Sequence, residues 1–132
     1  MDIQRAATYR PGVSGPHQKS SPISTVVADL DGGRTPDAVL LATAVRELLR
    51  ALAVAAPGRS VEVRVPPYGA VQCVPGPRHA RGTPPNVVET DPVTWVEVAT
   101  GRLTWVAAIA EGRVSASGPR TDLSQYLPLS DT

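Results

Sequence analysis

The stretch from Cys73 to Asp91 constrains the fold most, because it separates two strand-like segments with a long loop rich in proline and glycine. Proline fixes φ and removes a backbone donor, whereas glycine widens the range of allowed conformations. The same loop carries Arg78, His79 and Arg81. We therefore expect a rigid crossover between strands that bears a local basic cluster.

The strongest helix signal covers residues 36–55. Thr35 is a good N-cap, Pro36 suits the first helical position, and Asp37 complements the helix dipole in the first turn. Apolar residues then recur at steps of three and four positions, which places them on one face of a helix: Ala38, Leu41, Ala42, Val45, Leu48, Leu49 and Leu52. A proline and a glycine follow, and they predict the end of the helix.

Alternating residues predict strands. Every second residue from Val61 to Val65 is valine, which indicates a half-buried strand over residues 60–65. A proline-rich turn connects it to a second strand over residues 70–74, so the two form an antiparallel hairpin. Residues 86–89 and 114–118 are expected to form two further short strands.

Short helices are expected at four further places: residues 23–30, 92–99, 105–110, and from 121 or 122 through 127. Asp91 and Thr104 are N-caps for the middle two, and Gly101 is a helix-stop glycine between them. Helices and strands do not alternate strictly along the chain. This order predicts an α+β domain with a mostly antiparallel sheet.

Two blocks of the sequence resemble a known family. The segment 99–127 reads A-T-G-R-L-T-W-V-A-A-I-A-E-G-R-V-S-A-S-G-P-R-T-D-L-S-Q-Y-L, with its G-R-L and G-R-V steps, and it resembles the closing half of the sterol carrier protein fold. The blocks R-S-V-E-V-R-V-P-P-Y-G-A-V-Q-C and G-P-R-H-A-R-G-T-P-P-N-V-V-E-T-D-P resemble the bacterial, especially actinobacterial, branch. They are also similar to the C-terminal domain of mycothiol-dependent maleylpyruvate isomerases. The resemblance covers residues 35–129.

The resemblance implies a twisted five-stranded sheet with helices packed on one face and an apolar tunnel between them. In lipid-carrying members, that tunnel holds fatty-acyl chains, sterols or acyl-CoA. The residue pattern itself shows four strands, so a fifth lies around residues 80–83 or is missing. We expect residues 23–132 to form this domain and residues 1–22 to be a flexible N-terminal arm.

Composition excludes several classes of function. The net charge is +1, which gives no general attraction to nucleic acid. The chain has one cysteine, so no disulfide scaffold forms, and no Cys/His spacing fits a metal site. No apolar run is long enough to span a membrane, and the N-terminus is unlike a signal peptide. A cytoplasmic protein, monomeric or homodimeric, is therefore expected.

Apolar residues of the last three predicted helices have two interpretations. Packing on the sheet would make them core, whereas the family resemblance implies that they line a ligand tunnel. The chain has little volume to spare, which disfavours a long sterol or acyl chain. The residues selected as candidates for apolar ligand contact are Trp95, Val98, Leu103, Trp105, Ile109, Leu123 and Tyr126, with Leu127 beside them.

The basic cluster also has two interpretations. Arg78, His79 and Arg81 can bind a carboxylate or phosphate, such as the acidic head group of a ligand, at the mouth of the site. Alternatively, the two arginines pair with Glu62, Glu89 or Asp91 and hold the loop against the sheet.

Catalysis is not expected. Cys73 and His79 are a conceivable nucleophile pair, but Cys73 lies in a predicted strand, where a buried and inert thiol is more common. No cofactor-binding fingerprint is present. The sequence therefore predicts non-enzymatic binding of a small apolar or amphipathic, lipid-like ligand. The alternative is an accessory module that docks on a partner enzyme and has no ligand of its own.

Overall fold

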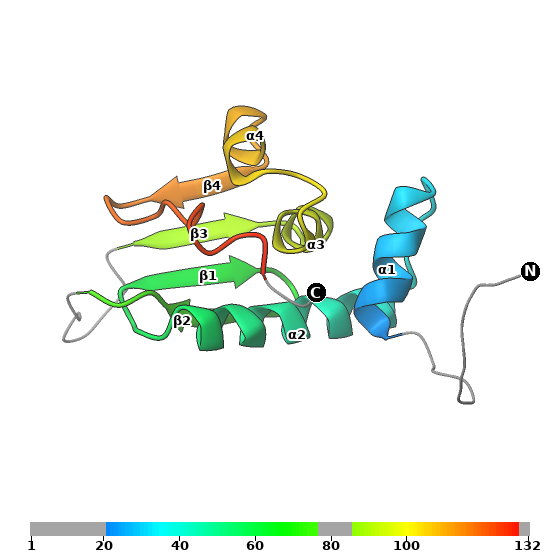
Figure 1. The fold of residues 1–132 in the computed structure, drawn as a ribbon, viewed down its shortest axis with the longest axis horizontal. Coiled ribbons are helices and arrows are strands. Elements are labelled where there is room, and N and C mark those ends of the chain that lie inside the picture. Colours follow the sequence, from blue (N-terminus) through cyan, green and yellow to red (C-terminus); the bar gives the residue numbers. More distant parts are fainter. Residues whose placement is uncertain (1–20, 77–85, 130–132) are drawn as a thin grey trace, which may run out of the picture.

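The structure, a computed structural model, describes residues 21–76 and 86–129 (Figure 1). Within these residues the chain forms an α+β fold, as the sequence predicts. In chain order, its elements are α1 (Pro22–Asp31), α2 (Ala38–Ala55), β1 (Val61–Val65), β2 (Gly69–Cys73), β3 (Val87–Thr90), α3 (Pro92–Thr100), α4 (Trp105–Ala110) and β4 (Val114–Ser117).

The four strands form one sheet in the order β2-β1-β3-β4. The predicted hairpin of β1 and β2 is confirmed, with Val61 opposite Cys73, and β4 pairs antiparallel with β3. Between them, β1 and β3 pair in parallel, so the sheet is mixed but mostly antiparallel. The connection from β2 therefore passes β1 to reach β3, and residues 77–85 within it lie outside the described part.

Helices cover one face of the sheet. Alternation in β1 directs Val61, Val63 and Val65 into the core, whereas Glu62 and Arg64 lie half-buried on the other face. Helix α2 contacts β2 and α3, and α4 lies at the opposite edge of the sheet, beside β4 (Figure 1). The apolar stripe of α2 supplies Leu48, Leu49 and Leu52 to the same core.

Local caps explain where the helices begin and end. Asp91 and Thr104 cap α3 and α4 as predicted, and Gly101 ends α3 in the left-handed conformation, at φ +86°. The predicted start of α2 is wrong by two residues. Asp37 rather than Thr35 is its N-cap, because the Asp37 carboxylate accepts a hydrogen bond from the Leu40 backbone N–H at 3.0 Å.

The last predicted helix, over residues 121–127, is also wrong. The segment is irregular, because the Asp122 carboxylate accepts a hydrogen bond from the Ser124 N–H at 2.9 Å. A turn follows, in which the Tyr126 N–H donates to the Leu123 carbonyl at 3.0 Å. A side chain that bonds the backbone two residues ahead stabilises a turn instead of a helix. We call residues 121–129 the C-terminal segment.

Candidate functional site

Four of the selected apolar residues belong to the buried core: Trp95, Val98, Trp105 and Leu123. Trp95 is 1% exposed, and its indole Nε1–H donates to the Val45 carbonyl at 3.3 Å. Leu123 is fully buried. Trp95 and Leu123 line none of the three hollows described here, whereas Val98 and Trp105 line one of them.

One hollow of about 220 Å³ brings together three of the selected residues: Val98, Leu103 and Trp105. We call it the tryptophan pocket. Helix α3 supplies one wall and α4 another, while the C-terminal segment closes the third side. Its described lining residues are Val98, Gly101, Leu103, Thr104, Trp105, Val106, Ser124, Leu127 and Pro128.

Helix α4 combines a buried and an exposed apolar face. All six of its residues are apolar, and Trp105 and Ala108 are buried. Val106 is 71% exposed and Ile109 is 41% exposed. Val106 reaches the rim of the tryptophan pocket, whereas Ile109 does not line it. Ile109 therefore lies at the surface, outside the lining of the tryptophan pocket.

Tyr126 lines a second hollow, of about 610 Å³, on the other side of the C-terminal segment. We call it the arginine groove, after Arg50 at its rim. Pro128 lines both hollows, so the C-terminal segment is a shared wall. The described lining residues of the groove are Arg50, Ala51, Val54, Ala55, Gln125, Tyr126, Pro128 and Leu129.

The shared wall is fixed at both ends. Leu123 is fully buried at one end and Leu129 is 6% exposed at the other. The Leu129 N–H also donates to the Ala99 carbonyl, at the end of α3, at 2.9 Å. An irregular segment thereby keeps a defined place between α3, α4 and α2.

The basic cluster of Arg78, His79 and Arg81 lies outside the described residues. The structure does show a buried polar network where the loop begins and ends. Asn86 donates its side-chain N–H to the Ser60 carbonyl at 2.7 Å and accepts the Arg120 N–H at 3.0 Å. Sequence reasoning missed this network, although a serine and an asparagine directly before valine-rich strands were a usable signal.

The Ser60 hydroxyl extends this network to the other side of the loop, where it donates to the Val74 carbonyl at 2.7 Å. Two of the acidic residues expected to pair with the basic cluster have partners elsewhere. Glu62 forms an ion pair with Arg64 at 3.2 Å, and Asp91 accepts two hydrogen bonds from Thr94.

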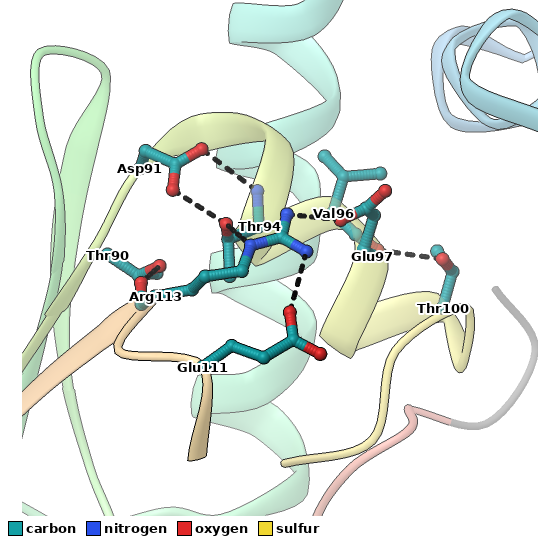
Figure 2. Close-up of polar contacts among 8 residues, drawn as sticks. All are labelled: Thr90, Asp91, Thr94, Val96, Glu97, Thr100, Glu111 and Arg113. Atoms are coloured by element: carbon teal, nitrogen blue, oxygen red, sulfur yellow. Dashed lines mark hydrogen bonds and ion pairs between the residues drawn. The ribbon is translucent and has the colours of Figure 1, made fainter. Parts of the chain in front are cut away.

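Arg113 connects α3 to the start of β4 (Figure 2). Its guanidinium donates to Glu97 Oε1 at 2.6 Å and to the Thr94 hydroxyl at 3.1 Å, and the Glu111 carboxylate lies 3.7 Å away. Thr94 in turn donates to Asp91. Burial raises the pKa of Asp91, but the bonds from Thr94 and the nearby Arg113 outweigh it, so that the pKa is lowered. All these groups have partners, so we assign them to positioning α3, which carries Val98.

The described residues offer little catalytic chemistry. Cys73 is buried, and burial raises the pKa of its thiol to about 11, so the thiol stays protonated at neutral pH. In residues 21–76 and 86–129, no three His, Cys, Asp or Glu side chains are grouped to hold a metal ion.

No helix in the same part of the chain is long and apolar enough to cross a membrane.

Comparison with known families agrees with the fold. The family model for a bacterial SCP ortholog, where SCP denotes sterol carrier protein, matches residues 37–129, well over half of the chain. No curated protein matches the sequence significantly. The matched region runs from the start of α2 through the C-terminal segment and includes both hollows. The chain therefore belongs to the bacterial SCP ortholog family, a sterol carrier protein-like family.

Proposed function

We propose that this protein binds a small apolar or amphipathic ligand in the tryptophan pocket and catalyses no reaction. The observation that supports this most is the convergence of Val98, Leu103 and Trp105 on one hollow inside the region that matches the family. Ligand sites in proteins are concave and mostly apolar, with a few polar groups. Thr104 and Ser124 are the hydroxyl residues in this lining.

The size of the pocket limits the ligand. Pockets for drug-sized ligands have roughly 300–1,000 Å³, and an engineered cavity of about 150 Å³ accepts benzene. At about 220 Å³, the tryptophan pocket suits a short apolar chain or a single ring. A sterol does not fit a hollow of this size. Recognition of an acidic head group by Arg78, His79 and Arg81 remains part of the proposal.

Fluorescence of the tryptophans tests the proposal, because Trp105 lines the pocket. Hexanol and hexanoate should give saturable changes in emission, confirmed by native mass spectrometry, whereas cholesterol should give none. The variant V106S removes an exposed apolar rim residue without disturbing the core, and we expect about two- to fivefold weaker binding. The variant I109S is the matched control on the same helix and should bind like the wild type.

An unchanged tryptophan emission with hexanol and hexanoate would contradict the proposal, provided that backbone amide chemical shifts around residues 98–106 also stay unchanged. Equal loss of affinity in V106S and I109S would show that the pocket is not the site. For the basic cluster, a variant with alanine at 78, 79 and 81 should weaken hexanoate binding and leave hexanol binding unchanged.

A second function, docking on a partner enzyme, is favoured by the outer face of α4. Val106 and Ile109 are exposed on a helix with no polar side chain. Helices that are apolar on all sides are normally covered. If docking is the function, a defined partner enzyme should bind the wild type and should not bind V106S/I109S, while hexanol titrations of the wild type remain silent.

A further inference from the structure

We propose that the arginine groove is a second ligand site and that it takes an amphipathic carboxylate, with the acid on Arg50 and the apolar chain along the end of α2. The groove is a separate hollow from the tryptophan pocket, so this inference goes beyond the function proposed above. It depends on three observations: the apolar floor, the charge at the rim, and an exposed valine that a ligand would cover.

The floor of the groove is apolar and large enough for a chain. Ala51, Val54 and Ala55 line it from α2, and Pro128 and Leu129 line it from the C-terminal segment. Its volume of about 610 Å³ lies within the usual range for small-molecule sites. Val54 is 81% exposed, the largest exposure among the large apolar side chains exposed in the described residues. An apolar chain in the groove would remove this side chain from water.

The rim carries one positive charge. Arg50 is exposed, and within residues 21–76 and 86–129 its guanidinium has no hydrogen bond or ion pair. The described lining includes no acidic side chain that would repel an anion. A guanidinium binds a carboxylate with two parallel N–H donors. Charge complementarity therefore selects an acid and rejects an amine.

A hollow along α1 provides a contrast. It has about 390 Å³ and is lined by Ile23 and Val27, with Arg102 as its cation. Arg102, however, is bound to Asp31 at 3.3 Å, and Asp31 also lines that hollow. An incoming carboxylate would have to replace a carboxylate that is already in place. Arg50 requires no such exchange.

Three probes of equal chain length test the site: decanoate, decanol and decylammonium, titrated at neutral pH by calorimetry on the full chain. Decanoate should bind more tightly than decanol, and decylammonium most weakly. The variant R50Q should lower the affinity for decanoate about three- to tenfold and leave decanol unchanged. Added salt should reduce the difference between decanoate and decanol.

Matched variants separate this site from the tryptophan pocket. R46Q removes an exposed arginine one turn earlier on α2, which bonds the Tyr68 carbonyl at 3.4 Å and does not line the groove, so its decanoate affinity should equal that of the wild type. V54S should weaken decanoate and decanol alike, about two- to fivefold. V106S should leave decanoate binding unchanged.

The inference would be overturned if R50Q bound decanoate as tightly as the wild type does. It would also be overturned if R46Q lost as much decanoate affinity as R50Q. Loss of decanoate binding in V106S but not in R50Q or V54S would also overturn it, while supporting the tryptophan pocket. Conversely, loss in R50Q and V54S together with silent hexanol titrations would support the arginine groove and reject the function proposed above.

Discussion

Replacing Arg113 by methionine should loosen the attachment of α3 to the start of β4. The guanidinium reaches Glu97 at 2.6 Å and Thr94 at 3.1 Å, on a helix that lies 16 to 19 residues earlier in the chain. Methionine keeps the apolar stem and removes the charge and the donors. Glu97 then loses its charged partner, and the buried Thr94 hydroxyl loses one of its two hydrogen bonds.

The magnitude follows from the exposure of the two charged side chains, 34% for Arg113 and 24% for Glu97. Exposed ion pairs contribute about 0.2–1 kcal/mol, whereas removing one partner of a buried pair costs about 3–5 kcal/mol. This pair lies between these limits and nearer to the exposed one, since solvent screens both groups. With the bond to Thr94, we expect R113M to lower the free energy of unfolding by about 1–2 kcal/mol.

Urea denaturation of wild type, R113M, E97Q and the double variant measures this directly as a double-mutant cycle. The coupling energy between Arg113 and Glu97 should be about 0.5–1 kcal/mol and should decrease with added salt. The control is R64M, which breaks the pair with Glu62 inside one strand. Its other interaction across elements is an electrostatic attraction to Glu89 on β3, so R64M should lower the free energy of unfolding less than R113M does. A coupling energy indistinguishable from zero, or an R64M effect as large as that of R113M, would refute the reasoning.

Two further predictions concern the core and the shared wall. Burial raises the folded-state pKa of Cys73 from 9.0 to about 11, so the unfolded chain releases this proton first as the pH rises. The contribution of the neutral thiol to the free energy of unfolding is therefore fully present below pH 9. It is lost towards pH 11, where the free energy of unfolding is lower by as much as about 3 kcal/mol. The stability of C73A, followed by urea denaturation at each pH, should lack this slope, and a parallel slope in both proteins would contradict the assignment. L123A should cost about 2–5 kcal/mol, because it empties a fully buried site, and should weaken both hexanol and decanoate binding. The exposed neighbour variant S124A should keep wild-type stability, and unchanged binding in a folded L123A would argue against the C-terminal segment as a wall of both hollows.

Local signals in the sequence predicted most of the fold, because they act through neighbouring residues. Asp91 and Thr104 cap helices by bonding backbone groups three residues ahead, and Gly101 supplies the left-handed residue that ends α3. The same kind of signal misled at residue 122, because a carboxylate that can cap a helix can equally close a turn. Sequence alone does not decide between these two outcomes.

Residues of the tryptophan pocket could be selected from the sequence, whereas the arginine groove could not. Val98, Leu103 and Trp105 are close in sequence, so one pattern selects all three, but it also selects Trp95, Ile109 and Leu123, which do not line the tryptophan pocket. The arginine groove joins residues 50–55 to residues 125–129, and no local pattern connects them. In the sequence, Arg50 lies off the apolar stripe and is indistinguishable from any solvated residue of an amphipathic helix. Its different role follows from the C-terminal segment that packs opposite it.

The C-terminal segment separates the residues that stabilise the fold from those at the rims of the two hollows. The apolar stripe of α2 and the valines of β1 form a closed core, and the hollows lie where this regular packing ends against an irregular wall. Leu123 fixes the wall, so its loss should change stability and binding together. Val54 and Val106 are exposed at the rims and contribute little to the core, so their loss should change binding alone. Substitutions at the rims can therefore alter the proposed binding without loss of the fold.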